Sequence, residues 1–443
     1  MSCRACYDKS MRIAIAGYGV EGRANYAYFS RGYPGAEVVI VDERGALSDA
    51  PEGVETLLGE GAFENLQGFD IVVRTAGLPP RKIKTAGVVT SATNEFFARC
   101  AEKGVPIIGV TGTKGKGTTC SLIASILRAA GKTVHLVGNI GVPALDVLPQ
   151  LQPNDVVVYE LSSFQLWDAE KSPHIAVVLM VEPDHLDVHA SFDEYVMAKS
   201  NIAAHQTASD VVIYHPTNEF SRRIAERSAG EKQRYATKED GGAYVRNGAF
   251  YMLEDAICGV YTLHIAGVHN QDNACAAISA VKKFLPEVTN QQIAEGLSAF
   301  DGLSHRLKFA AEKNGVKYYD DSIATTPGSA LAAIRAFDQP KVLLLGGRDK
   351  GGDYRELFEV SRTQDVQVVA YGENRQKLQD MMNQFGVNYV VESGDIRAVV
   401  RTASSLAKPG SVVILSPAAS SFDMFKNYTD RGEQFIRAIK EAP

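Results

Sequence analysis

Residues 110–119 read VTGTKGKGTT, a segment rich in glycine and threonine near the first quarter of the chain. The apolar run 105–110 before it predicts a buried strand, and apolar residues at helical spacing after it predict a helix. Glycines and a helix N-terminus leave backbone N–H groups and a positive dipole pointing at the loop. Lys116 adds a cation, and Thr118 or Thr119 adds a hydroxyl that can reach Mg²⁺. The segment therefore predicts a phosphate-binding loop.

The match to the general pattern G-x-x-x-x-G-K-[ST] is incomplete. Val110 stands where the pattern has its first glycine, and Gly117 stands where it has Ser or Thr. From the residues alone, a glycine-rich turn without a ligand stays open as the alternative.

Length and composition narrow the class of protein. At 443 residues the chain is long enough for about three domains, and no apolar run reaches the length of a membrane span. A net charge of -6 argues against a nucleic-acid partner. Six scattered cysteines do not form a disulfide framework, and no secretory signal follows Met1. We expect a cytoplasmic protein without membrane insertion.

A second glycine motif lies near the start of the chain. Residues 12–16 predict a strand, GYGVEG at 17–22 predicts a tight loop, and the residues after it predict a helix and a strand that ends at Asp42. Taken alone, this βαβ unit predicts a dinucleotide site, as in a nicotinamide-dependent oxidoreductase. That interpretation gives the phosphate-binding loop no role. The other alternative is that the glycine motif at 17–22 serves the fold alone.

Two strands after the phosphate-binding loop end in polar residues. Glu160 follows the apolar run 155–159, and His185 follows the run 175–181. In an open parallel sheet, binding sites lie at the carboxyl ends of the strands. We therefore expect Glu160 and His185 to be ligands of a hard cation beside a nucleotide. Lys199 lies on a predicted helix over 195–205, where three interpretations stay open. It faces phosphate, carries CO₂ as an anionic carbamate, or is an ordinary solvated lysine.

The last third of the chain alternates strands and helices again, which predicts a second Rossmann-like layer. Its strands are expected near 316–319, 342–345, 366–371, 389–391 and 412–415. Upstream of it, Asn270 and Asn273 lie one helical turn apart and can share an adenine edge. Alternatively, Asn270 caps the helix.

Together these motifs resemble the Mur ligase family. The loop has the form G-T-x-G-K-G-[ST], which places the metal-binding hydroxyl on Thr118, and residues 160–166 read ELSSFQL. Further on, SPAA at 416–419 is followed by FKNY at 425–428 and RG at 431–432. The members of the family that add glutamate are the most similar.

The resemblance covers the whole chain and implies an α/β fold of three domains. They are an N-terminal Rossmann-like UDP-binding domain (1–99), a central ATPase domain with a phosphate-binding loop and a parallel sheet (100–303), and a C-terminal Rossmann-like domain that binds the amino acid (304–443).

The resemblance also implies an ATP-dependent amide ligase of peptidoglycan precursor synthesis. Its substrates are UDP-MurNAc-L-Ala and glutamate, most often D-glutamate, and it uses ATP and two Mg²⁺ ions. The carboxylate of the UDP substrate becomes an acyl phosphate, from which the amine of glutamate displaces phosphate. We expect a monomer.

The functional residues of the family carry over onto positions of this sequence. Catalysis is assigned to Lys116, Glu160, His185 and Lys199. The UDP substrate is assigned to Gly19, Val20, Glu21, Asp42, Arg44, Gly77, Asn139, Ser162 and Gln165. ATP is assigned to Gly112, Thr113, Lys114, Gly115, Lys116, Gly117, Thr118, Thr119, Asn270, Asn273, Arg306 and Asp321. The amino acid is assigned to Thr325, Lys350, Ser421, Phe422 and Tyr428. Metal is assigned to Thr118, Glu160, His185 and a carbamylated Lys199.

One departure concerns the amino acid. The family commonly has lysine where this chain has Ile323, so a cation near the glutamate pocket is missing. A relative that adds L-glutamate therefore stays open, as does a folylpolyglutamate synthetase-like ligase, which shares the form of the phosphate-binding loop. A non-catalytic nucleotide-binding regulator would lack the metal ligands that are present here.

Overall fold

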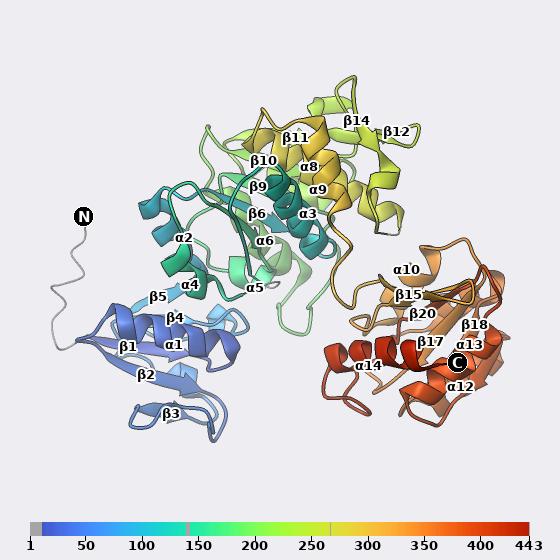
Figure 1. Cartoon of the computed structure of the whole chain (residues 1–443). Helices are drawn as coiled ribbons and strands as arrows, with labels where there is room; N and C mark the ends of the chain where they lie inside the picture. Colours follow the sequence, from blue (N-terminus) through green and yellow to red (C-terminus); the bar gives the residue numbers. More distant parts are fainter. Residues whose placement is uncertain (1–10, 139–141, 266, 443) are drawn as a thin grey trace. The chain divides into compact units, whose positions relative to one another are not determined.

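The computed structural model describes residues 11–138, 142–265 and 267–442, which form a mixed α/β protein. It divides into two compact units, which are described separately below (Figure 1). The first unit runs up to Thr262 and includes Asp272–Leu297. The second unit comprises Leu263–Gln271 and the chain from Ser298 onward. Within the described residues, no helix is both long and apolar enough to cross a membrane.

The first sheet of unit 1 confirms the βαβ prediction. Five parallel strands pair in the order β3-β2-β1-β4-β5, and helix α1 (Val20–Gly32) follows the glycine loop. Gly17 has a φ of +93°, and a Cβ there would lie 2.2 Å from Thr75 Oγ1. A Cβ on Gly22 would lie 2.1 Å from the Gly17 carbonyl oxygen, so both glycines are needed for the turn and for helix packing. The strands are β1 (Arg12–Ala16), β2 (Glu37–Asp42), β3 (Thr56–Leu58), β4 (Ile71–Arg74) and β5 (Val88–Ser91).

The second sheet of unit 1 is also parallel, and it carries the phosphate-binding loop. Its strand order is β11-β10-β9-β6-β8-β7, and every residue of β6 and β8 is buried, as expected for strands covered on both faces. The strands are β6 (Ile107–Thr111), β7 (Val134–Gly138), β8 (Val156–Glu160), β9 (Ile175–Val178), β10 (Val211–Tyr214) and β11 (Glu231–Arg234). The helices along these strands are α2 (Ala92–Lys103), α3 (Lys116–Ala129), α4 (Ala144–Val147), α5 (Ser163–Leu166), α6 (Phe192–Ala204) and α7 (Glu219–Ala225).

One strand of this sheet is shorter than the sequence predicts. The apolar run 175–181 predicts a strand, yet β9 ends at Val178. Its neighbour β6 ends at Thr111, opposite Val178, because the phosphate-binding loop begins there. Beyond Val178, Leu179 N–H donates to the Thr111 carbonyl and the Met180 carbonyl accepts from Thr113 N–H, so the partner there is the loop and no longer a strand.

A small antiparallel sheet in unit 1 escaped the sequence analysis. It consists of β12 (Ala243–Arg246), β13 (Ala249–Met252) and β14 (Asp255–Gly259). Asn247 and Gly248 connect the first two strands with φ angles of 50° and 75°. An Asn-Gly pair between two short apolar runs is the strongest local signal for a hairpin, so the sequence did contain the information. Helices α8 (Val268–Phe284) and α9 (Asn290–Ser298) follow this sheet.

Unit 2 contains the predicted second Rossmann-like layer. Its strand order is β15-β16-β20-β17-β18-β19, parallel except for β15. Leu343 and Leu345 pack in one core, whereas Val342 and Leu344 pack in the core on the other face. The strands are β15 (Lys308–Lys313), β16 (Val316–Asp320), β17 (Lys341–Gly346), β18 (Gln367–Tyr371), β19 (Tyr389–Val391) and β20 (Val412–Leu415). The helices are α10 (Pro327–Arg335), α11 (Arg355–Thr363), α12 (Arg375–Phe385), α13 (Ile396–Leu406) and α14 (Tyr428–Glu441).

Candidate active site

The phosphate-binding loop has the predicted strand, loop and helix. Gly115 is the N-cap of α3 and has a left-handed φ of 83°. The Lys116 ammonium donates to the carbonyls of Gly112 at 3.0 Å and Thr113 at 2.9 Å, so it lies across the mouth of the loop. Lys114, whose position the sequence left open, has a side chain 74% exposed and 3.9 Å from Glu182. It therefore lies at the rim.

Gly115 also brings a residue from a distant helix to the loop. A Cβ at this position would lie 2.5 Å from Asn273 Oδ1, so the Asn273 amide of α8 sits against the loop. Its predicted partner Asn270 is inside α8, which begins at Val268, and the alternative that Asn270 caps the helix is therefore wrong. The structure thus places one of the two asparagines assigned to ATP beside the phosphate-binding loop.

We expect Gly115→Ala to weaken ATP binding at least about tenfold, because the new methyl group displaces Asn273 and strains the loop. The left-handed backbone should also lower the free energy of unfolding by about 1–2 kcal/mol. Gly131→Ala is the matched control, since Gly131 has a φ of 79° but open space around it. Calorimetric titration with a non-hydrolysable ATP analogue and thermal unfolding separate the two effects. Equal ATP affinity in Gly115→Ala and the unmodified protein would contradict the expectation.

Lys199 is the most unusual side chain of the site. It is 1% exposed, and its ammonium nitrogen donates to the Gly112 carbonyl at 2.9 Å and lies 3.4 Å from Thr111 Oγ1. The interpretation as a solvated helix lysine is therefore wrong. Burial lowers the pKa of Lys199 well below its usual value, and the nearby Lys116 lowers this pKa further. The shift favours the neutral amine more than in an exposed lysine.

Two acidic groups also act on the pKa of Lys199. Asp184 and Glu160 both act to raise the pKa of Lys199, against the larger effects of burial and of Lys116. Glu160, which is 3% exposed, ends β8 beside β6, and Val110 of β6 pairs with it. Lys116 and Lys199 donate to the same Gly112 carbonyl, and Glu160 ends the strand next to β6, so these three residues lie at the carboxyl ends of neighbouring strands.

His185 lies at the edge of this cluster. It has a positive φ of 53°, its side chain is 48% exposed, and its Nε2 is 3.6 Å from Asp184 Oδ2. A second histidine, His189, was missed by the sequence analysis and is 2% exposed. Its Nε2 lies 3.0 Å from Ser163 Oγ, and its ring stacks on Phe164. The only sequence signal was its place four residues after His185.

The oxygen donors of the cluster fit a Mg²⁺ ion. The carboxylate of Glu160 and the hydroxyl of Thr118, which is 6% exposed, are the ligand types that Mg²⁺ prefers. The hydroxyl of Thr119 is buried and has no hydrogen-bond partner in the described part of the chain. Across residues 11–138, 142–265 and 267–442, no three His, Cys, Asp or Glu side chains converge as a complete metal site. A bound ion would therefore take its remaining ligands from water or phosphate oxygens.

In the N-terminal sheet, Asp42 organises Arg44. Its two carboxylate oxygens accept hydrogen bonds from the backbone N–H groups of Tyr18 and Arg44 and from the Arg44 guanidinium. The Arg44 bonds hold the pKa of Asp42 at about 2. Asp42 thus has its oxygens occupied, and the Arg44 side chain that it holds is 52% exposed.

Glu21 ties the first glycine loop to the loop that carries Gly77. Its carboxylate accepts a 2.9 Å hydrogen bond from the backbone N–H of Ala76. Burial raises the pKa of Glu21. Gly19 and Val20, which were assigned to the UDP substrate as well, lie at the start of α1 beside Glu21.

Arg74 joins two further segments assigned to the UDP substrate, a role that no sequence motif indicates. This fully buried arginine pairs with Asp168 at 2.5 Å and donates to the carbonyls of Leu78 and Phe164. The Gly77 loop is thereby connected to the segment of Ser162 and Gln165. Those two residues form a capping box on α5, which occupies the side-chain oxygen of Gln165. Asn139 lies outside the described residues.

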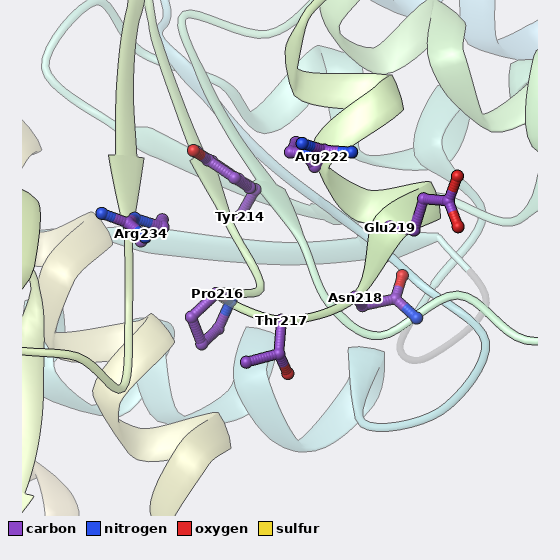
Figure 2. Close-up of a pocket in the computed structure, with 7 residues that line it drawn as sticks. All are labelled: Tyr214, Pro216, Thr217, Asn218, Glu219, Arg222 and Arg234. Atoms are coloured by element: carbon purple, nitrogen blue, oxygen red, sulfur yellow. The ribbon is translucent and has the colours of Figure 1, made fainter.

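A cavity of about 360 Å³ opens at the carboxyl ends of β10 and β11. Arg222 and Arg234 lie on opposite sides of Tyr214 in it (Figure 2). Arg234 is paired with Glu239 and Asp240, and Arg222 is paired with Glu226. None of the residues assigned to substrates lines this cavity.

In unit 2, Asp321 is a buried carboxyl group. It follows β16 and accepts hydrogen bonds from Ser416 Oγ at 2.7 Å and from the backbone N–H of Leu307 at 3.0 Å. Burial raises the pKa of Asp321 to about 7, although Ser416, Leu307 and Arg306 act in the opposite direction. At neutral pH this group is therefore close to half-ionised.

We expect Asp321→Asn to stabilise the protein, and more so as the pH rises. The pKa of Asp321 in the folded protein is about 7, above the ordinary value of 3.8, so the folded state holds the proton more tightly than the unfolded state. The protein therefore loses stability as the pH rises from the lower pKa to the higher one. The difference between the two pKa values corresponds to a free energy of about 4 kcal/mol, at about 1.36 kcal/mol per pH unit. Chemical denaturation at pH 5 and pH 8 should show a gain at pH 8 that is larger by about 2–3 kcal/mol. The exposed Asp338→Asn serves as control, and a gain independent of pH would contradict the assignment.

The residues assigned to the amino acid lie on loops of unit 2, apart from Tyr428, which begins α14. Ser421 is 3% exposed, whereas the side chains of Phe422 and Tyr428 are 60% and 41% exposed. Lys350 lies on the exposed loop after β17 and forms no ion pair within the described residues. Thr325 is half-buried just before α10.

Comparison with known proteins places this geometry in a family. Residues 110–281 match the Mur ligase middle domain, and residues 305–419 match the Mur ligase glutamate ligase domain. A UDP-N-acetylmuramoylalanine--D-glutamate ligase from Clostridium perfringens is 33% identical to this chain over 98% of its length and 97% of the relative. The chain belongs to the Mur ligase family. The relative of the same name from Caldanaerobacter subterraneus is also 33% identical, over 98% of this chain and 99% of the relative.

Solved structures of Mur ligases share the fold. The UDP-N-acetylmuramate-alanine ligase MurC from Thermotoga maritima superposes with a TM-score of 0.62 over 97% of this chain and 99% of that chain, at 17% identity. A folylpolyglutamate synthase from Mycobacterium tuberculosis, solved with ADP and AMPPCP, gives a TM-score of 0.56 over 77% of this chain and 95% of that chain, at 16% identity. At these identities the likeness concerns the fold alone.

Proposed function

We propose that this Mur ligase joins D-glutamate to UDP-MurNAc-L-Ala in an ATP-dependent reaction of peptidoglycan precursor synthesis. The observation that carries the proposal is that Lys116 and Lys199 share the Gly112 carbonyl of the phosphate-binding loop while Glu160 ends the neighbouring strand. The D-glutamate ligases that match this chain over nearly its full length support the choice of substrates.

The reaction has two steps, both of which the charges of the site suit. A carboxylate oxygen of UDP-MurNAc-L-Ala attacks the γ-phosphorus of ATP, and ADP leaves. The amine of D-glutamate then attacks the acyl carbon, a proton is lost from the nitrogen, and phosphate leaves with the former carboxylate oxygen. Because the first step brings two anions together, Lys116 must turn from the loop carbonyls to the phosphates and offset their charge.

We propose that Thr118 and Glu160 hold one Mg²⁺ ion and that His185 and Lys199 serve a second. Bound Mg²⁺ would neutralise charge on the phosphates. Lys199 fits this role once its neutral amine has added CO₂ and lost a proton, because the resulting carbamate is an anionic oxygen ligand. The lowered pKa of Lys199 favours the neutral amine that this addition needs.

We also propose three functional domains within this cytoplasmic, monomeric enzyme. Residues 1–99 hold the UDP substrate, residues 100–303 hold ATP, and residues 304–443 hold the amino acid. In this scheme Asn270, Asn273, Arg306 and Asp321 surround the nucleotide, and Thr325, Lys350, Ser421, Phe422 and Tyr428 hold glutamate.

Phosphate release with ATP, Mg²⁺ and UDP-MurNAc-L-Ala tests the proposal when D-glutamate and L-glutamate are supplied separately. We expect release with D-glutamate only, which would mean that the pocket works with Ile323 in place of lysine. Release with L-glutamate only would replace the proposal with the L-glutamate-adding relative. Release with neither amino acid would overturn it.

A further inference from the structure

Arg431 is completely buried in unit 2 and is bound to two loops at once. Its Nε donates to Ser322 Oγ at 2.9 Å, and Nη2 donates to the Ser322 carbonyl at 2.7 Å. Both terminal nitrogens also donate to the Ala419 carbonyl, at 3.2 and 3.1 Å. Ser322 belongs to the loop after β16, and Ala419 belongs to the loop after β20. One side chain on α14 therefore connects the two loops.

Among the described residues, Arg431 forms no ion pair with a carboxylate. All the hydrogen-bond acceptors of its guanidinium there are neutral oxygens. A buried cation without a carboxylate is strongly unfavourable, so simple packing does not account for an arginine here. The net positive charge suits a site for an anionic amino acid.

Ser322 also bonds the first residue of α14, the helix that carries Arg431. Its hydroxyl accepts from Arg431 and donates to the Tyr428 carbonyl at 2.8 Å. Ser322 is fully buried, so this relay is shielded from water. The anchored positions Ser322, Ala419 and Tyr428 are at most three residues from the positions assigned to the amino acid, which are Thr325, Ser421 and Tyr428 itself.

Two glycines hold Arg431 in place. A Cβ on Gly432 would lie 2.1 Å from His305 Nδ1 and 2.6 Å from Asp320 Oδ2, so α14 is pressed against that histidine–aspartate pair. A Cβ on Gly347 would lie 2.4 Å from the Ser420 carbonyl and 3.3 Å from Arg431 Nη1. Because the chain packs closely at both glycines, the guanidinium has little room to move, as a positioning residue requires.

We propose that Arg431 is a positioning residue for the incoming amino acid and that it acts through Ser322 on the loops that hold this substrate. The inference rests on the proposed function, because it takes the amino-acid residues from there.

Ser322→Ala tests the inference without emptying the core. We expect the KM for D-glutamate to rise about tenfold, as expected for the loss of a hydrogen bond to a charged group, while the KM values for ATP and UDP-MurNAc-L-Ala change less than about twofold. Arg431→Lys should raise the KM for D-glutamate at least as much, since lysine cannot bridge both loops. Ser361→Ala is the matched control, because Ser361 is equally buried and donates at 2.7 Å to the Leu357 carbonyl of its own helix.

The outcomes are distinct. Equal D-glutamate KM values in Ser322→Ala and Ser361→Ala, or an equal rise in all three KM values in Ser322→Ala, would overturn the role of Arg431 alone. A wild-type protein that forms no product with any amino acid would overturn the proposed function itself and this inference with it.

Discussion

Replacement of Lys116 by alanine should lower kcat for phosphate release by about a thousandfold or more, with the fold intact. The Lys116 ammonium lies at the mouth of the phosphate-binding loop, where it bonds the Gly112 and Thr113 carbonyls. It is the cation best placed to offset the charge that accumulates when a carboxylate meets the γ-phosphate. Loss of such a group from phosphoryl transfer removes several orders of magnitude in rate. Steady-state phosphate release measures the effect, and circular dichroism verifies the fold.

Lys114→Ala provides the control in the same loop. Lys114 is exposed and lies 3.9 Å from Glu182, so its removal should change kcat by less than about threefold. Full activity in Lys116→Ala, or equal losses in the two variants, would show that the loop does not bind phosphate in the proposed way.

Lys199→Ala should lower activity about a hundredfold or more, and short carboxylates such as formate or acetate should restore part of it. The substitution removes both the bond to the Gly112 carbonyl and the carbamate proposed to serve Mg²⁺. A small carboxylate can enter the space left by the side chain and supply the missing anionic oxygen. Activity assays with and without the additive measure the rescue.

A second readout is independent of activity. Protein equilibrated with ¹³C-labelled CO₂ should give a carbamate carbon signal in the unmodified chain and none in Lys199→Ala. Lys103→Ala is a suitable control, because Lys103 is also a helix lysine that donates to two carbonyls, those of Leu148 and Leu151. An identical carbon spectrum in the unmodified protein and Lys199→Ala would exclude the carbamate.

The sequence predicted the parts of the site that depend on local pattern. Glycines at fixed spacing between a strand and a helix identified both the loop at Gly115 and the loop at Gly17, and the structure confirms each conformation. Glu160 was predicted from its place at the end of an apolar run, since parallel strands bring such ends together.

Long-range packing explains what the sequence did not predict. The residues alone left Lys199 open between a phosphate contact, a carbamate and a solvated lysine, and only the approach of the Gly112 carbonyl shows that it is buried. Arg74 pairs with Asp168, a residue far away in the sequence, and no local pattern marks that pair. Arg431 belongs to the RG motif at 431–432, but the motif does not show that its guanidinium bonds the Ala419 carbonyl. The elevated pKa of Asp321 likewise follows from burial that no local pattern encodes.

The most direct test of the proposed reaction follows one oxygen atom. UDP-MurNAc-L-Ala labelled with ¹⁸O in its terminal carboxylate would be turned over with ATP and D-glutamate, and the released phosphate would be analysed by mass spectrometry. An acyl phosphate predicts that each phosphate carries one labelled oxygen from the carboxylate. Phosphate released without the label would contradict activation of that carboxylate, and with it the account of this chain as a ligase of the UDP substrate.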